Sequence, residues 1–141
     1  MPSDIHASCV ALKSQGILLL GASGAGKSDL ALRLIMNYGA QLVADDRVSL
    51  ISNAAGALFA ACPSAIAGLL EARGVGIIKM PYRKRAKIKL AVKLISHPPE
   101  SLPLPQFYTF EGVKIPQIEL NPFEESAAAK IVAALKFAVM I

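Results

Sequence analysis

Residues 21–28 read Gly21-Ala22-Ser23-Gly24-Ala25-Gly26-Lys27-Ser28, a stretch that fits the pattern G-x-x-x-x-G-K-[ST]. The apolar run 17–20 stands before it, and apolar residues at helical spacing follow over 30–35. A strand, a glycine-rich loop and a helix in this order form a phosphate-binding site, because the loop amides and the helix start both face the anion. The sequence therefore predicts a phosphate-binding loop (P-loop) that holds a nucleoside triphosphate.

Two side chains of this loop have separate predicted roles. Lys27 contacts the outer phosphates, and the Ser28 hydroxyl holds a Mg²⁺ ion. The following helix should run to about Tyr38, because Gly39 suits the left-handed position that ends a helix. The motif predicts the ligand but leaves the reaction open.

Length and composition limit the class of protein. A chain of 141 residues fits one domain, which we expect over residues 1–141. The apolar runs are shorter than the ~18 residues of a membrane span, and the N-terminus lacks a secretory signal pattern, so we expect a cytoplasmic protein without a membrane partner. Cys9 and Cys62 are isolated and favour buried single cysteines. The net charge of +5 suits an anionic partner but does not indicate nucleic acid.

The next notable motif is the pair Asp45-Asp46, directly after a short apolar strand over residues 41–44. In phosphoryl transfer one carboxylate can hold Mg²⁺ while another accepts the proton of the attacking hydroxyl. A plain turn that starts with Asp is the alternative. The position of the pair, one helix and one strand after the glycine-rich loop, favours the catalytic interpretation.

A third stretch combines charge with glycine: Glu71-Ala72-Arg73-Gly74-Val75-Gly76-Ile77-Ile78. If it is extended, Glu71 and Arg73 share a face and can form a polar site. By itself the pair is more typical of a surface ion pair, which contributes little. Pro63-Ser64 before this stretch predicts a short helix through Leu70.

The remaining segments alternate between hairpins and a basic strand. Hairpins are expected where runs 9–12 and 17–20, 48–51 and 57–60, and 107–110 and 114–120 adjoin. Alternation over 87–94 predicts a strand with a lysine-rich outer face. The segment 82–85 is expected to be an exposed basic loop for an anionic partner. Asn121, Pro122 and Glu124 predict a capped helix from Pro122 to about Ala138.

The order of these motifs resembles the catalytic domain of the HPr kinase/phosphorylase family. The resemblance spans roughly residues 5–80 and rests on His6-Ala7-Ser8, the glycine-rich loop, Leu42-Val43-Ala44-Asp45-Asp46 and Glu71-Ala72-Arg73-Gly74-Val75-Gly76-Ile77. That family phosphorylates a serine of HPr, the phosphocarrier protein of the sugar phosphotransferase system, and can reverse the reaction with inorganic phosphate. The resemblance implies a short form without the family's N-terminal domain, ATP and Mg²⁺ as cofactors, and a hexamer.

The resemblance also implies a fold and catalytic roles. The fold is α/β, with a P-loop core and a mixed sheet of the type shared with phosphoenolpyruvate carboxykinase. Asp45 corresponds to the general base, and His6, which alone would suggest only a solvated side chain, corresponds to the histidine paired with that base. Asp46 is implied to be a metal-binding or serine-positioning carboxylate. Ser28 and Glu71 correspond to the Mg²⁺ ligands.

Further residues follow from the same resemblance. Lys27 and the loop amides hold the nucleotide phosphates, and Arg73 and Gly74 belong to a signature strand. The family's arginine after that strand corresponds to Arg83 or Arg85. The chain departs from the family before the last helix, where a P-G-R-N-type segment is replaced by Leu120-Asn121-Pro122-Phe123-Glu124.

Two other functions are compatible with the motifs. One is a P-loop kinase for a small metabolite, although the chain lacks an arginine-rich lid segment. The other is a non-catalytic regulatory module that binds nucleotide and docks a partner through its basic loop. A GTPase is disfavoured because no N-K-x-D base-reading motif is present.

Overall fold

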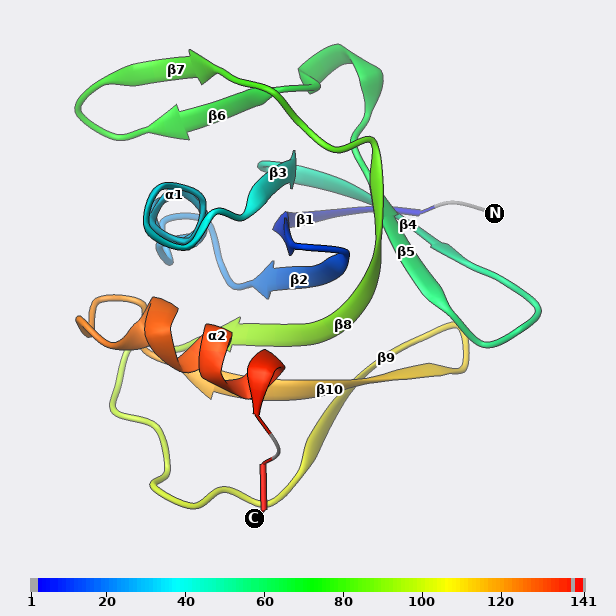
Figure 1. Ribbon diagram of the computed structural model, residues 1–141, viewed down its shortest axis with the longest axis vertical. Helices are drawn as coiled ribbons and strands as arrows, with labels where there is room; N and C mark the ends of the chain where they lie inside the picture. Colours follow the sequence, from blue (N-terminus) through cyan, green and yellow to red (C-terminus); the bar gives the residue numbers. More distant parts are fainter. Residues whose placement is uncertain (1–2, 138, 141) are drawn as a thin grey trace.

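The computed structural model, which describes residues 3–137 and 139–140, has two helices packed on one face of a strongly curved sheet (Figure 1). No helix within these residues has the length and apolar content needed to cross a membrane. The elements are β1 (Ser3–Leu12), β2 (Gln15–Leu20), α1 (Lys27–Tyr38), β3 (Gln41–Ala44), β4 (Arg47–Ser52), β5 (Leu58–Ala61), a 3₁₀ turn (Ser64–Ile66), β6 (Leu69–Ala72), β7 (Gly76–Lys79), β8 (Arg85–Leu94), β9 (Gln106–Phe110), β10 (Val113–Leu120) and α2 (Ala127–Lys136).

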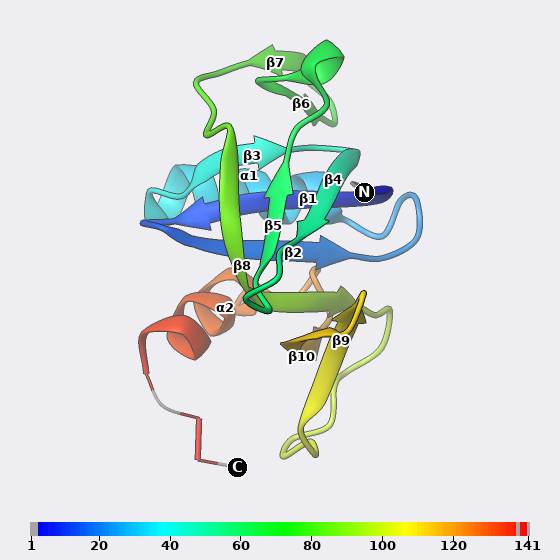
Figure 2. The same cartoon turned by 90° about the vertical axis from the view of Figure 1, so that its right-hand side faces the viewer.

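The main sheet is mixed, as predicted, and it closes on itself. Its eight strands follow the order β2-β1-β4-β5-β8-β10-β9, with β3 paired to β1. The long strand β8 pairs antiparallel with β5 at its start and parallel with β2 further on, so that β2, β1, β4, β5 and β8 form a ring. Figure 2 shows the β6–β7 hairpin, a separate two-stranded sheet, at one end of the molecule and the β9–β10 hairpin at the other.

Both faces of the central strands β1 and β2 are buried, and this burial sets the register in which the two strands pair. Val10 and Ile17 point to the cluster beneath the two helices, whereas Cys9 and Leu18 point to the second cluster on the other side of the sheet. Alternate side chains of one strand face opposite sides, so a slip of one residue would move each set into the cluster that is packed for the other. The strands are therefore a rigid base for groups at their ends.

Several local predictions are confirmed. Helix α1 ends at Tyr38, and Gly39 takes the left-handed conformation with φ of 75°. The three expected hairpins are present. Strand β8 alternates as its sequence indicates, with Ile88 and Leu90 buried and Lys87 and Lys89 exposed.

Two predictions for residues 63–78 are wrong. The segment after Pro63 forms only a 3₁₀ turn before β6 begins at Leu69. The stretch 71–78 is a hairpin rather than one strand, because Gly74 has a φ of 89° and lets the chain turn. Arg73 and Gly74 therefore lie in the turn and not on the strand with Glu71.

The last helix also begins later than predicted. The Asn121 carboxamide accepts a hydrogen bond from the Phe123 amide, which forms an Asx turn in place of the predicted helix cap. Arg33 on α1 donates to the carbonyls of Pro122 and Glu124, which holds this segment as a turn against α1. Helix α2 accordingly starts at Ala127 and ends at Lys136, and Ala138, included in the predicted helix, lies outside the described residues.

Candidate active site

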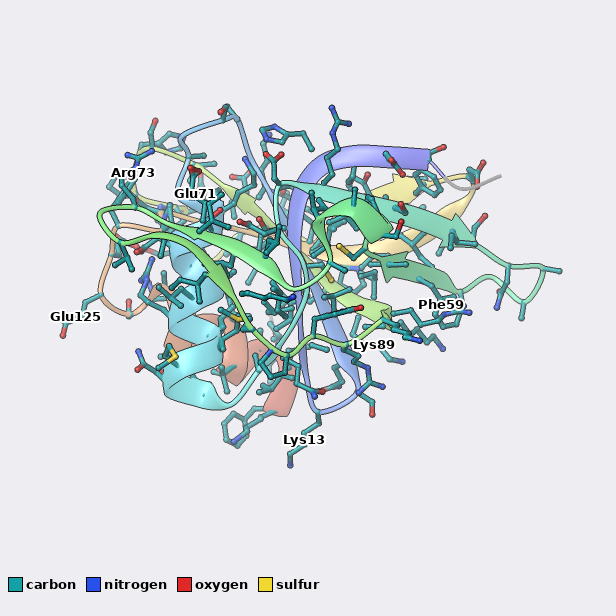
Figure 3. All side chains as sticks on the ribbon, turned by 90° about the horizontal axis from the view of Figure 1, so that it is seen from above. Lys13, Phe59, Glu71, Arg73, Lys89 and Glu125 are labelled. Carbon is teal, nitrogen blue, oxygen red and sulfur yellow. The ribbon has the colours of Figure 1, made fainter. Side chains whose placement is uncertain are left out.

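A cavity of about 440 Å³ lies where β2 ends and α1 begins. It brings together the glycine-rich loop, the start of β1, the end of β3 and the β6–β7 hairpin, from which Glu71 and Arg73 project in Figure 3. Its lining consists of His6, Ser8, Ser23, Gly24, Gly26, Lys27, Ser28, Asp29, Asp46, Glu71, Arg73 and Phe123. Three stretches identified separately in the sequence therefore meet at one site.

The glycine-rich loop is held in a tight turn. Gly24 and Gly26 have φ of 82° and 102°, which glycine adopts without strain, and the Ala25 amide bonds the Ala22 carbonyl at 3.0 Å. The Lys27 ammonium folds back to the carbonyls of Gly21 and Ala22, at 2.8 Å each. Burial lowers the pKa of Lys27, against the opposing effect of the Asp46 and Asp45 charges. The lysine is thus a buried cation beside the loop.

Asp45 is buried, with 4% of its surface exposed, and joins three elements. Its carboxylate accepts hydrogen bonds from the Ser28 hydroxyl at 2.8 and 2.9 Å, and from the Ser8 hydroxyl at 2.6 Å. The backbone amide of Glu71 donates a further bond at 3.1 Å. Both carboxylate oxygens are therefore engaged, and Asp45 fixes the loop, β1 and the hairpin relative to one another.

The neighbouring Asp46 has opposite surroundings. The Arg47 amide bonds the Asp45 carbonyl at 2.9 Å across Asp46, whose φ is 72°, so Asp46 is the centre of a strained γ-turn. This turn sends the two acids in different directions. The Asp46 side chain is 72% exposed, lines the cavity and lies 2.9 Å from His6 Nε2. The expected pairing of His6 with Asp45 is wrong, because the turn brings Asp46 to His6 instead.

Ser8 is a site residue that the sequence analysis assigned no role. It belongs to the quoted His6-Ala7-Ser8 motif, and the available signal was its spacing, because residues two apart on a strand share a face. Ser8 lines the cavity, is fully buried, and donates its hydroxyl hydrogen bond to Asp45. The same strand face therefore supplies both acids with a partner, His6 for Asp46 and Ser8 for Asp45.

Phe123 is a second residue without a predicted role. Its side chain is among the exposed large hydrophobic groups, yet it lines the cavity beside the glycine-rich loop. The sequence marked this segment only as a departure from a family pattern. A contact between residues that lie so far apart in the chain follows from the packing of α2 and its preceding turn against α1, which local motifs do not encode.

The donor set fits a magnesium ion. Mg²⁺ prefers oxygen ligands and in kinases takes one or two carboxylates, completing its shell with phosphate and water. The Ser28 hydroxyl and the Asp45 carboxylate lie in hydrogen-bond contact, and the Glu71 side chain lines the same cavity. Among the described residues, no three His, Cys, Asp or Glu side chains are grouped to hold a metal on their own.

Arg83 and Arg85 lie apart from this cavity. The Arg83 guanidinium bonds the carbonyls of Lys13 and Arg85, and its amide bonds the Leu42 carbonyl. Arg85 starts β8, with its guanidinium 4.3 Å above the Phe59 ring. Lys13 precedes β2 whereas the glycine-rich loop follows it, and Figure 3 shows Lys13 far from Glu71 and Arg73. The segment 82–85 is therefore mostly exposed, as predicted, but the contacts of its two arginines anchor it to the scaffold.

The chain is similar to known proteins of one family. The family model described as the HPr Serine kinase C-terminal domain matches residues 2–140. The HPr kinase/phosphorylase of Lactobacillus acidophilus is 35% identical over 106 residues, covering 70% of this chain and 33% of that protein. The enzyme of the same name from Bordetella pertussis is 38% identical over 100 residues, covering 66% and 32%. The chain thus spans about a third of the length of these curated relatives.

A solved structure extends the likeness to nearly the whole chain. The Hpr(Ser) kinase/phosphatase of Coxiella burnetii superposes with a TM-score of 0.79 at 27% identity, covering 94% of this chain and 93% of that one. The similarity therefore includes α2 and the β9–β10 hairpin as well as the motif-bearing half. The chain belongs to the HPr serine kinase C-terminal domain family.

Proposed function

We propose that this chain is an ATP- and Mg²⁺-dependent protein kinase that phosphorylates a serine of the phosphocarrier protein HPr. One observation carries the proposal: two adjacent acids in opposite environments flank the glycine-rich loop, with Asp45 buried on Ser28 and Asp46 exposed beside His6. Phosphoryl transfer to a hydroxyl requires one acid for the metal and another for the proton. HPr is proposed as the protein substrate because the names of the relatives contain it.

The loop side of the site binds the phosphates of ATP. The amides of the glycine-rich loop and the Lys27 ammonium face the anionic oxygens, and Lys27 exchanges its bonds to Gly21 and Ala22 for bonds to phosphate. Ser28, Asp45 and Glu71 are the residues that would hold Mg²⁺. When bound, Mg²⁺ neutralises charge on the phosphate oxygens as it develops.

The acid side of the site activates the serine. We assign the base to Asp46 and the metal-binding role to Asp45, the reverse of the assignment that the resemblance suggested. Asp45 has both oxygens engaged by donors, whereas Asp46 opens on the cavity. Asp46 accepts the proton as the serine oxygen bonds the γ-phosphorus, and the bond from that phosphorus to ADP breaks. His6 positions Asp46 through the 2.9 Å contact.

The resemblance of the sequence motifs completes the proposal. The chain acts as a single catalytic domain in the cytoplasm, regulates the sugar phosphotransferase system and assembles as a hexamer. With inorganic phosphate as acceptor, a phosphate oxygen bonds the phosphorus of the phosphoserine and the bond from that phosphorus to the serine oxygen breaks. Asp46 passes the proton of the attacking phosphate to the serine oxygen, and the products are free serine and pyrophosphate. The names of the curated relatives support this reversal.

The test is phosphotransfer to purified HPr with Mg·ATP, followed by mass spectrometry of HPr. Wild type should add one phosphate to a serine. Asp46→Asn should lower the rate by about 10²–10⁴-fold with nucleotide affinity retained, and Asp45→Asn should lose metal-dependent nucleotide binding. Asp4→Asn, an exposed acid that bonds Ser49 on the sheet, is the control and should keep full activity.

Two outcomes contradict parts of this proposal. An unmodified HPr in the presence of a wild-type protein that binds ATP would refute HPr as the substrate. A fully active Asp46→Asn variant would refute Asp46 as the base.

A further inference from the structure

A second cavity adjoins the first and has different chemistry. It has a volume of about 420 Å³ and is lined by Ala22, Ser23, Gly24, Ala25, Leu94, Ile95, Ser96, His97 and Phe123. Ser23, Gly24 and Phe123 line both cavities, so the two are contiguous across the glycine-rich loop. The first cavity is lined by three acidic side chains and by the cationic side chains of Lys27 and Arg73. In the second cavity, His97 is the one ionisable side chain among the lining residues.

This difference in charge indicates which end of a bound nucleotide each cavity would hold. The acids, Lys27 and Ser28 all line the first cavity or lie beneath it, so the reacting end of a triphosphate belongs there. The remainder of the molecule is an uncharged sugar and an aromatic base, which must leave the loop on another side. The second cavity is contiguous with the loop, apolar along Leu94 and Ile95, and within the size range of small-ligand sites.

Phe123 lines both cavities and lies on an exposed turn whose backbone is held in place. The ring is 73% exposed, and a Cβ built on Gly26 would lie 3.6 Å from its Cζ. The turn is fixed on both sides of Phe123, because Arg33 bonds the carbonyls of Pro122 and Glu124, and Asn121 accepts the Phe123 amide at 2.9 Å. An aromatic side chain on a fixed backbone at a cavity mouth can offer its face to another ring, and the turn itself need not be ordered on binding.

We propose that the second cavity takes the nucleoside half of the nucleotide, with its base stacked on the Phe123 ring. The inference rests on the proposed function, because it assumes that the first cavity binds the phosphates. Stacking tolerates any base, since every base has an aromatic face. Phe123 therefore contributes affinity that is shared by ATP and GTP and that inorganic tripolyphosphate lacks.

Isothermal titration calorimetry with Mg·ATP, Mg·GTP and Mg·tripolyphosphate tests this. Phe123→Ala should weaken ATP and GTP alike by about 10- to 100-fold and leave tripolyphosphate unchanged. Phe123→Tyr should retain wild-type affinity. Phe137→Ala removes another exposed phenylalanine, 71% exposed after α2, and should change none of the three.

Failure of the Phe123 stacking site and failure of the proposed kinase function give different results in this titration. Unchanged ATP affinity in Phe123→Ala would overturn the stacking site while phosphate binding stands. An equal loss for tripolyphosphate would also overturn it, because the ring would then act on the shape of the glycine-rich loop. A wild-type protein that binds neither ATP nor tripolyphosphate would overturn the proposed function itself.

Discussion

His6 Nε2 lies 2.9 Å from Asp46 Oδ1, across 40 positions of sequence, and this contact selects one acid of an adjacent pair. It forms because the γ-turn at Asp46 directs that carboxylate toward the start of β1, while Asp45 stays buried on Ser8 and Ser28. The two acids are thus adjacent in the chain, and their side chains have different hydrogen-bond partners.

The first prediction concerns His6. Because the His6 ring pairs with Asp46 and not with a loop residue that binds phosphate, His6→Gln should lower kcat by about tenfold and leave the Kd for Mg·ATP within twofold. Steady-state kinetics beside calorimetry measures both quantities. A loss confined to ATP affinity would contradict the positioning role.

A second prediction uses the strained backbone at Asp46. Glycine adopts a φ of 72° freely, so Asp46→Gly should raise the free energy of unfolding by about 1 kcal/mol while abolishing phosphotransfer. Asp46→Asn should leave stability nearly unchanged, since asparagine tolerates this region. Urea denaturation measures both variants, and a destabilised glycine variant would argue against strain at this position.

Ser8 provides a third prediction with a matched control. Ser8→Ala removes a buried 2.6 Å bond to a carboxylate and should cost about 2 kcal/mol of unfolding free energy. Ser49 donates a bond of the same length to Asp4 on the exposed side of the sheet, and Ser49→Ala should cost under about 0.5 kcal/mol. Equal losses in the two variants would show that burial does not decide the effect.

The fourth prediction concerns the pH dependence of stability. Complete burial raises the pKa of the Cys9 thiol from 9.0 to about 12. The unfolded chain therefore loses this proton first, so the contribution of Cys9 to stability is full below pH 9 and declines as the pH rises toward 12.

Denaturation of wild type and Cys9→Ala at pH 8 and pH 11 isolates this effect. The gap in unfolding free energy between the two proteins should shrink by about 1 kcal/mol per pH unit above pH 9. Groups common to both proteins cancel in the difference. A gap that is constant with pH would mean that the thiol ionises in the folded protein.

Much of the site could be predicted from sequence because its motifs are local. The glycine-rich loop, the acid pair and Glu71 each lie within a short stretch whose chemistry is recognisable, and all three stretches contribute to one site. The directions in which the Asp45 and Asp46 side chains point could not be predicted. It depends on a single backbone dihedral at Asp46, and sequence patterns indicate a turn without giving its sign.

The late start of α2 has a related cause. Asn121, Pro122 and Glu124 form a sound capping pattern by local rules. The carbonyls of Pro122 and Glu124 instead bond Arg33 from α1, a tertiary contact that outweighs the local preference. Arg83 and Arg85 were misplaced for the same kind of reason, because their partners Lys13, in the turn before β2, and Phe59, on β5, are distant in the sequence.

The residues of the site lie on two kinds of structural element. The first wall of the site is formed by elements that are tied to the core through the burial of both faces of β1 and β2, and the second wall is formed by surface turns. Ser8, Asp45 and Ser28 sit on elements tied to the core, where most substitutions disturb packing. Arg73 and Phe123 sit on a hairpin turn and a surface turn. Evolution can therefore vary the second wall, and with it the preferred partner or nucleotide, while the chemistry of the first wall stays constant.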